Sequence, residues 1–291
     1  MLTLLEQSKY LQNPLQKGVI QVYVRSTPVL EKLPFVQVNG NAYQYNVEDA
    51  LPNVGFRAVN TPYEESHGTI QRKTEAIKIF GGTTKIDKFL VASQGNINDI
   101  RSIQTEMAAT AAALLFTKSF FKGDSSVDAN EFDGLEKRLA GDQVLDGSQA
   151  AIIGDLTTIV DKLIDRVVGG PDMLFMSADM RRALNASMRL QNQAIETISD
   201  VFGRQVQAYA GVQIGVIEHD NKGLPILTND IYACRFGAGS YVSGLQVGPL
   251  TVTDQGERDV WLQTLIEWYA SIAVFHPRAA ARISGLPTFI S

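Results

Sequence analysis

The sequence contains little that supports redox or metal chemistry. Its 291 residues include one cysteine and three histidines. Cys234 cannot form a disulfide within the chain, and the strand-like residues around it, IYACRFG, indicate a buried structural thiol. His67, His219 and His276 lie far apart, without the short spacing of metal ligands. We therefore predict neither a metal site nor a redox site.

Phosphate-binding loops are also missing. In FGAGSYVSG, Gly237 and Gly239 begin a G-x-G-x-x-G pattern, but Val242 stands where the third glycine belongs. In IFGGTTKID no glycine precedes a Gly-Lys-Ser/Thr end at the required distance. Both stretches are expected to be turns between strands, so the sequence predicts no bound cofactor.

No residue pattern marks an active site. Glu64 beside Glu65, and Asp220 beside His219, are the remaining candidates for acid–base catalysis. Each pair lies in polar, turn-forming sequence, where solvated loop residues are expected. We predict no catalytic residues and a protein that is not an enzyme, and an enzyme with no recognisable site stays open as an alternative.

Long apolar runs and strong charge are absent as well. The most apolar helical stretch, Met107 to Phe116, is about half of the roughly 20 residues that cross a bilayer. The first residues, MLTLLEQSKYLQNPLQKG, lack the features of a secretory signal. A formal net charge of −5 disfavours a protein that mainly neutralises phosphates. We expect cytoplasmic synthesis and no membrane contact.

A long helix is the most prominent element that the sequence does predict. It covers residues 96 to 122, or about 40 Å at 1.5 Å per residue. Four alanines form a small-residue surface for close packing: Ala108, Ala109, Ala112 and Ala113. The residues that recur at helical spacing are Ile97, Ile100, Ile103 or Gln104, Met107, Ala111, Leu114, Lys118 and Phe121.

A long strand near the end of the chain is the expected partner of this helix. Residues 260–274 alternate with a period of two, over far more residues than an ordinary strand. One face carries Val260, Leu262, Thr264, Ile266, Trp268, Ala270, Ile272 and Val274; the other carries Gln263, Glu267 and Ser271. We expect the long helix to lie on a long β-ribbon.

The region before the helix is expected to be extended. The first thirty or so residues predict an arm, and the runs around Asn39–Gly40 predict a hairpin or a kinked strand. Residues 48–68 are polar and rich in proline and glycine, and TIQRKTEAIKIF is strand-like again. Two such segments form a projecting loop, which is marginal alone and is expected to dock on another subunit.

The middle of the chain predicts compact α/β structure. GDLTTIVDKLIDRVV and SADMRRALNASM are helical, DMLFMS is a buried strand, and VQAYAGVQIGVIEHD gives strands interrupted by Gly211 and Gly215. Arg181 and Arg182 are expected on a solvated helix face rather than in a functional patch.

This order of elements resembles the major capsid protein of tailed bacteriophages, a fold shared with encapsulins and the floor of herpesvirus capsids. The resemblance covers nearly the whole chain. It rests on the loop LPFVQVNGNAYQYNVEDALPNVGFRAVNTPYEESHGT, the helix NINDIRSIQTEMAATAAALLFTKSFFKGD, the central MLFMSADMRRALNA, and the ending WLQTLIEWYASIAVFHPRAAARISGL.

The resemblance implies an α+β fold in six segments. These are an N-terminal arm (1–33), an extended loop (34–80), a peripheral domain with the spine helix (81–145), an axial domain (146–245), long peripheral strands (246–278) and a C-terminal return to the axial domain (279–291). The loop and arm are expected to contact neighbouring subunits through Arg57, Tyr63, Glu64, Glu65, Arg72 and Lys73. Some members of the family cross-link their subunits covalently through lysine; Lys73 and Lys78 are the candidates here, but ordinary solvated lysines beside Glu75 are the favoured explanation.

The implied function is a structural one. Hexamers and pentamers would close into an icosahedral shell around double-stranded DNA, held without sequence-specific binding, in a virion made in the bacterial cytoplasm. Implied partners are further copies of the chain, a portal, and decoration or scaffolding proteins; the short segment before the loop favours a separate scaffold or none. An encapsulin-like compartment is the alternative, although Pro14 and Gly18 disfavour a long cargo-binding helix at the N-terminus.

Overall fold

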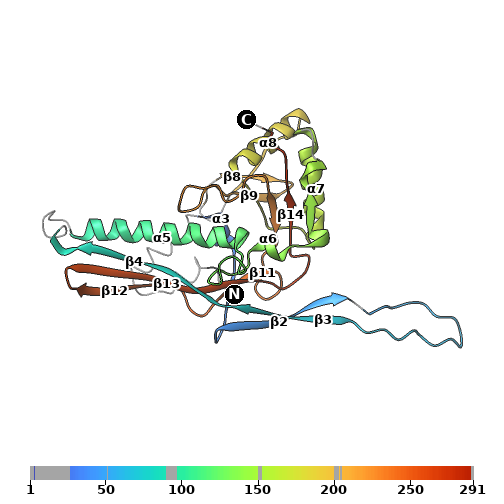
Figure 1. The fold of residues 1–291 in the computed structure, drawn as a ribbon. Helices are drawn as coiled ribbons and strands as arrows, with labels where there is room; N and C mark the ends of the chain where they lie inside the picture. The colour runs from blue at the N-terminus through green and yellow to red at the C-terminus, as the bar shows by residue number, and fades with distance from the viewer. Residues whose placement is uncertain are drawn as a thin grey trace.

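The chain folds into a mixed α+β structure, which confirms the predicted class. The computed structural model describes Thr3 and residues 27–50, 52–89, 97–149, 153–199, 203 and 205–289. Figure 1 shows a long helix along one sheet, a second sheet carrying two helices, and a two-stranded ribbon that projects away from both. Most of the expected N-terminal arm lies outside the described residues.

The first sheet is organised around one long strand. Its five strands are β1 (Phe35–Gln37), β4 (Lys78–Asp87), β11 (Val242–Gln246), β12 (Thr251–Arg258) and β13 (Trp261–Val274). Strand β13 pairs antiparallel with β4 over ten residues, and also with β11 and β12. This makes β13 the central strand of the sheet, and its 14 residues confirm the long strand that the sequence predicts. The glycine-containing stretch expected to be a turn, IFGGTTKID, is instead part of β4, so that expectation is wrong.

The long helix, α5 (Ile97–Lys122), lies on this sheet as predicted. Trp268 of β13 is fully buried, with its ring centroid 5.4 Å from that of Phe116 on α5 and 5.0 Å from that of Phe35 on β1. Ala109 and Ala113 are also fully buried in this core, because their small side chains let the helix approach closely.

The helix buries a different stripe from the one that spacing suggested. Ile103 and Met107 are 54% and 60% exposed, whereas Thr105, Ala109 and Ala113 are buried. On β13, the predicted inward face is confirmed at the alternate residues from Thr264 to Ile272. The other face is not fully solvated, however: Ser271 is buried too, because the base of the ribbon covers this end of the strand.

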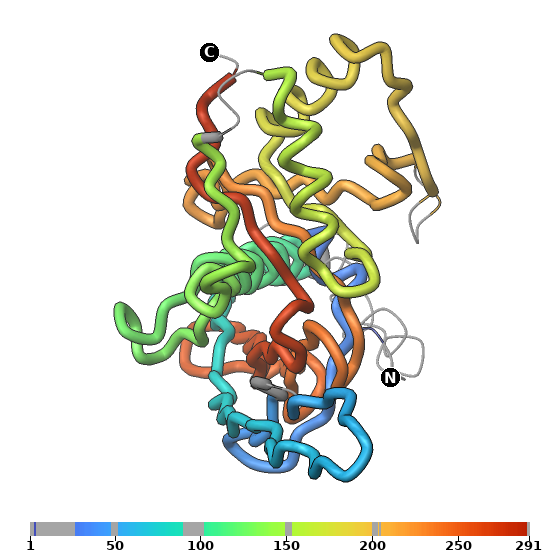
Figure 2. The backbone as a smooth tube through the Cα atoms, turned by 90° about the vertical axis from the view of Figure 1, so that its right-hand side faces the viewer, coloured from blue at the N-terminus to red at the C-terminus, as the bar shows by residue number. Residues whose placement is uncertain are grey.

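The second sheet has seven strands and two covering helices. Its order is β5 (Val144–Asp146), β14 (Ala280–Ser284), β10 (Ile231–Cys234), β6 (Met173–Met176), β9 (Val212–Val216), β8 (Gln205–Tyr209) and β7 (Glu196–Ser199). Helices α7 (Leu156–Arg166) and α8 (Ala178–Leu190) confirm the two predicted helices. Figure 2 shows these helices on the far side of the sheet from α5.

Successive side chains of β6 point to opposite faces of this sheet. Met173 and Phe175 of β6 pack toward the α5 side, while Leu174 and Met176 pack toward α7 and α8. Gly215 does not interrupt a strand as expected but lies within β9. A β-carbon there would come 2.9 Å from the Phe175 ring, so glycine permits the close approach.

The projecting ribbon consists of β2 (Ala42–Ala50) and β3 (Thr69–Ala76), paired antiparallel. This confirms two extended segments around a long loop. Of the two alternatives expected around Asn39–Gly40, the hairpin is wrong, because β1 pairs in parallel with β11 and only β2 enters the ribbon; the kinked strand agrees with the bend between β1 and β2. Just before β1, Pro28–Lys32 form a short helix, α3, where extended chain was expected.

Short elements connect the long helix to the second sheet. They are α6 (Leu135–Arg138) and three 3-10 turns, η1 (Gly141–Gln143), η2 (Gly147–Gln149) and η3 (Ile153–Asp155). Helix α6 follows a loop that returns against the end of α5, where the Gly134 amide donates to the Gly123 carbonyl over 2.8 Å. A β-carbon on Gly134 would come within 2.6 Å of the Ser119 carbonyl oxygen, so the turn requires glycine.

Candidate assembly interface

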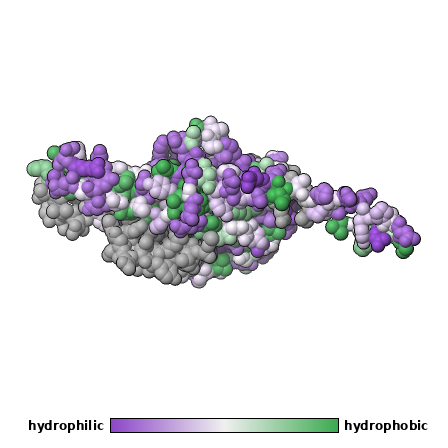
Figure 3. Space-filling view, turned by 90° about the horizontal axis from the view of Figure 1, so that it is seen from below, coloured by the Kyte–Doolittle hydropathy of each residue, from purple (hydrophilic) through white to green (hydrophobic). Residues whose placement is uncertain are grey.

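The far end of the ribbon exposes large apolar side chains. Residues 52–68 connect β2 to β3, and within them Val54 is 88% exposed and Phe56 fully exposed. Val59 and Tyr63 are exposed nearby, and Figure 3 shows apolar patches among polar ones where the ribbon reaches farthest from the body. Exposed apolar groups gathered on a projection are typical of a surface that another molecule covers.

Hydrogen bonds give this tip a defined shape. The Ser66 hydroxyl donates to the Asn53 carbonyl over 3.1 Å and closes the neck of the loop. The Arg57 guanidinium lies 5.2 Å from the centre of the Tyr63 ring and donates to the carbonyl oxygen of Thr61. The tip encloses an open cavity of about 550 Å³ lined by 53–58 and 61–64. We call residues 53–66 the tip loop.

The six predicted contact residues are all exposed, in two groups. Arg57 and Tyr63 are brought together in the tip loop, and Glu64 and Glu65 follow them there. Arg72 and Lys73 lie on β3, opposite Asn46 and Tyr45 of β2. In the described part of the chain, no ion pair includes Glu64, Glu65, Arg72 or Lys73.

The base of the ribbon is held by a nearly buried ion pair that the sequence did not indicate. Arg138 of α6 forms a two-pronged salt bridge with Glu75 of β3, and one of its bonds measures 2.6 Å. The Tyr45 hydroxyl donates to the same carboxylate over 3.1 Å. Burial, followed by the Glu75 charge, raises the pKa of Tyr45 far above its ordinary value. The pair therefore fixes where the ribbon leaves the body.

Aromatic packing reinforces this base on the other side. The Tyr45 ring centroid lies 4.7 Å from that of Phe275, and Tyr43 approaches the same ring at 6.0 Å. Tyr45 and Val47 are buried against the end of β13, next to Ala273. The ribbon is therefore anchored at its base, where β2 begins and β3 ends.

A second polar cluster connects the end of α5 to the seven-stranded sheet. The Lys122 ammonium lies 2.6 Å from Asp230 and 2.9 Å from Glu136, and Arg282 lies 2.8 Å from Glu136. Burial opposes the charge on Glu136, but hydrogen bonds from both cations outweigh it and lower the pKa of this carboxyl. We call Lys122, Glu136, Asp230 and Arg282 the junction cluster.

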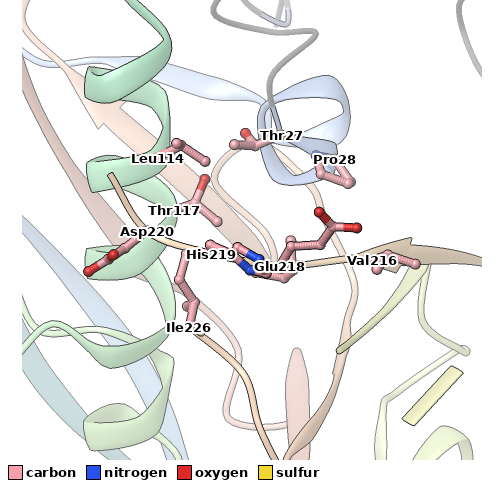
Figure 4. Close-up of a pocket in the computed structure, with 10 residues that line it drawn as sticks. Thr27, Pro28, Leu114, Thr117, Val216, Glu218, His219, Asp220 and Ile226 are labelled. Carbon is pink, nitrogen blue, oxygen red and sulfur yellow. The ribbon is translucent and has the colours of Figure 1, made fainter. Parts of the chain in front are cut away.

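The catalytic candidates do not assemble into a site. Asp220 is buried, and its carboxylate accepts from the amides of Lys222 and Leu224 and lies 3.4 Å from Lys118. The Leu224 amide makes the largest contribution to lowering the pKa of Asp220, which marks a carboxylate that stabilises a turn. In Figure 4 this carboxylate points toward α5, away from His219, which lines an open cavity of about 280 Å³.

The other reactive side chains are likewise engaged in structure. Cys234 is fully buried, and burial raises the pKa of its thiol. Lys78 donates to the Ala129 carbonyl over 2.6 Å. Arg182 is an exposed residue paired with Asp179, as expected, whereas Arg181 is half-buried.

Among the described residues, no group of three or more potential ligands is placed to hold a metal ion. Gly237 and Gly239 form a turn, as expected, in which the amides of Ser240 and Tyr241 donate to the Gly237 carbonyl. No helix in the part of the chain that the structure describes is long and apolar enough to cross a membrane.

Comparison with known proteins agrees with this geometry. The family model for "Major capsid protein GP7" matches residues 12–159, just over half of the chain. No curated protein matches the sequence. The match includes the ribbon, the tip loop and α5, the elements that carry the exposed projection.

Solved structures share the fold at low sequence identity. An encapsulin, SrpI from Synechococcus elongatus PCC 7942, is 17% identical over 86% of this chain and 84% of its own, with a TM-score of 0.64. A structure from Mycobacterium phage Bobi is 13% identical (88% and 89% covered, TM-score 0.60). The structure of the phage G gp27 major capsid proteins with gp26 decoration proteins gives 11% identity (88% and 90% covered, TM-score 0.59).

Proposed function

Because the chain belongs to the major capsid protein GP7 family, we propose that it assembles as hexamers and pentamers into the icosahedral shell of a tailed phage. The shell encloses double-stranded DNA, and the chain acts as a structural protein with no catalytic residues. It is made in the host cytoplasm and resides in the virion. The observation that carries the proposal is the projecting ribbon with its exposed apolar tip.

Assembly would stabilise the ribbon by covering it. A two-stranded ribbon without a third strand is marginal in water, and a fully exposed Phe56 gains nothing from folding within its own subunit. Covering the tip by another copy removes this apolar surface from water. Closed symmetry then repeats the same contact around the shell, so that many weak contacts add up to a stable assembly.

The predicted segments take roles within this proposal. Residues 34–80 form the loop that reaches a neighbour, residues 81–145 with 246–278 form the peripheral part, and residues 146–245 with 279–291 surround the symmetry axes. Arg57, Tyr63, Glu64, Glu65, Arg72 and Lys73 are the proposed intersubunit contacts. A portal and a scaffolding or decoration protein are the further proposed partners.

An encapsulin-like compartment is a second candidate, because the structure of the SrpI encapsulin complex shares this fold over most of both chains. A compartment of this kind contains protein, whereas a phage head contains DNA. The contents of shells purified from the organism that makes this protein therefore decide between the two functions.

Deleting the tip loop tests the assembly proposal. Asn53 and Ser66 are already hydrogen-bonded to each other, so removing 53–66 shortens the ribbon without pulling its strands apart. We expect folded subunits with α5 intact by circular dichroism, and no closed shells by electron microscopy. Normal shells from the deletion variant would refute the role of the tip.

A pair of matched substitutions makes the test sharper. Phe56→Ser removes an exposed apolar group from the tip, and Val127→Ser removes one from the loop after α5, where Val127 is 86% exposed. If the tip docks on a neighbour, F56S lowers the yield of shells while V127S leaves it unchanged. An equal loss in both variants would indicate a general effect of surface hydrophobicity.

A further inference from the structure

The bend between β1 and β2 carries a reactive pair of residues. Of the three places where the sequence has Asn or Asp followed by Gly, only Asn39–Gly40 contains an asparagine. Asn39, Gly40 and Asn41 are all exposed, and Gly40 has a φ of 118°. Among the described residues, neither the Asn39 side chain nor the Gly40 amide has a hydrogen-bond partner.

We propose that Asn39 is a site of spontaneous deamidation and isoaspartate formation, located at the hinge from which the ribbon projects. The Gly40 nitrogen attacks the side-chain carbonyl carbon of Asn39. A new C–N bond forms, the side-chain amide leaves as ammonia, and a cyclic succinimide results. Water then opens the ring at either carbonyl, giving aspartate or isoaspartate. Nothing is oxidised or reduced, and water is the only co-reactant.

The local structure favours this reaction at Asn39. Glycine has no β-carbon, so its nitrogen is open to attack and its backbone rotates freely through the required geometry. A β-carbon built on Gly40 meets no atom within 4 Å, so no neighbouring atom crowds this side of the bend. Among the described residues, neither reacting group is held by a hydrogen bond that cyclisation would have to break.

One of the two Asp-Gly pairs, Asp133–Gly134, shows how the folded chain can block this reaction. At Asp133–Gly134, the glycine amide that would attack already donates to the Gly123 carbonyl over 2.8 Å. The Asp133 carboxylate accepts from the Ser125 amide over 2.9 Å. Cyclisation there would break both bonds. The tertiary structure therefore protects this pair and leaves Asn39–Gly40 open.

The position of the bend gives the modification a mechanical consequence. On one side, the Val38 amide donates to the Gln246 carbonyl over 2.8 Å; on the other, Asn41 accepts from Ile77 over 2.9 Å. Only Asn39 and Gly40 separate these two fixed points. An isoaspartate inserts one extra carbon into the backbone between them, and each product adds one negative charge. We infer that the modification changes the direction in which the ribbon projects from the body.

Peptide mapping of the intact protein tests the modification directly. Trypsin releases residues 33–57 as one peptide that contains both Asn39 and Asn41. During incubation in native buffer, we expect amide-to-acid conversion at Asn39 to be at least about tenfold faster than at Asn41, a barrier difference of about 1.4 kcal/mol. Methyl transfer by an isoaspartate methyltransferase identifies the isoaspartyl product. Equal rates at the two asparagines would overturn the proposal.

A matched variant tests whether the folded structure, and not the Asn-Gly sequence alone, controls the rate of conversion. D133N introduces a second Asn-Gly pair where the glycine nitrogen is already bonded. We expect the introduced asparagine to remain intact in the folded protein while Asn39 converts, and both to convert at similar rates in denaturant. Equal conversion in the folded variant would refute the protective role of the structure.

The expected change in the direction of the ribbon matters only if the proposed function is right, and the yield of closed shells measures it separately. N39S keeps Gly40 but removes the reacting amide. Aged wild-type subunits are expected to form fewer closed shells than fresh ones, while aged and fresh N39S give equal yields. Full yields from highly modified subunits would refute the hinge effect alone. No shells from fresh protein, with rapid conversion at Asn39, would count against the assembly proposal and not against the modification.

Discussion

Breaking the ion pair at the base of the ribbon should destabilise the protein strongly. The Glu75 and Arg138 side chains are only 14% and 12% exposed. Removing one partner of a buried pair leaves an uncompensated charge and costs 3–5 kcal/mol in fully buried cases. After R138M, Glu75 keeps the Tyr45 hydroxyl as a donor, so we expect a loss of about 2–3 kcal/mol in the free energy of unfolding.

A double-mutant cycle isolates this interaction from other effects of the substitution. Arg138 also donates to the Asp133 carbonyl over 2.6 Å, and R138M removes that bond in every background. Replacing Glu75 and Arg138 together by methionine leaves no unpaired charge, so the double variant should be more stable than R138M. We expect a coupling energy of about 2 kcal/mol.

Urea unfolding followed by tryptophan fluorescence measures these differences, because Trp268 is fully buried. R182M is the matched control: its pair with Asp179 is about 60% exposed on both sides and should be worth about 0–0.5 kcal/mol. A coupling energy below about 0.5 kcal/mol for Glu75 and Arg138 would show that the pair does not hold the ribbon.

Three further predictions concern the body of the subunit. Because the pKa of Glu136 is lowered below 4.5 in the folded state, its contribution to stability is present above that pH and lost as the pH falls; E136Q should flatten this acid-side decline in urea unfolding. Cys234 should resist thiol reagents until the protein unfolds, so rapid labelling of the native protein would contradict its burial. G81A should lower the melting temperature more than G82A, because only at Gly81 would a β-carbon clash with the Ile266 carbonyl oxygen, at 2.1 Å.

Local patterns in the sequence were sufficient for the main elements. The helix of residues 97–122, the long strand ending at Val274, and α7 and α8 each repeat a simple period over many residues, and that period depends only on backbone geometry. Glycine was less informative. Gly81 and Gly215 lie inside strands, where neighbouring atoms approach too closely for a side chain, and this reason is invisible without the neighbours.

The candidate interface was likewise predictable from the sequence only in part. The polar stretch of 52–68, with its prolines and glycines, predicted a projecting loop, and Val54 and Phe56 within it were the available signal for an apolar tip. Arg138 gave no such signal, because its partner Glu75 lies 63 residues away. The link between Lys122 and Asp230 spans 108 residues and is equally hidden.

The sequence by itself determined the long helix, the long strand, the two helices of the second sheet and the exposed loop, since these follow from the spacing of apolar residues and from proline and glycine. Only the tertiary structure decided which face of α5 is buried, where the ribbon is anchored, and that the Gly134 amide is bonded while the Gly40 amide is not. The physical reason is that each of these depends on contacts between residues far apart in the chain, such as Trp268 with Phe116. The spacing of apolar residues reports only on local structure, whereas tertiary packing brings residues that are distant in the sequence into contact.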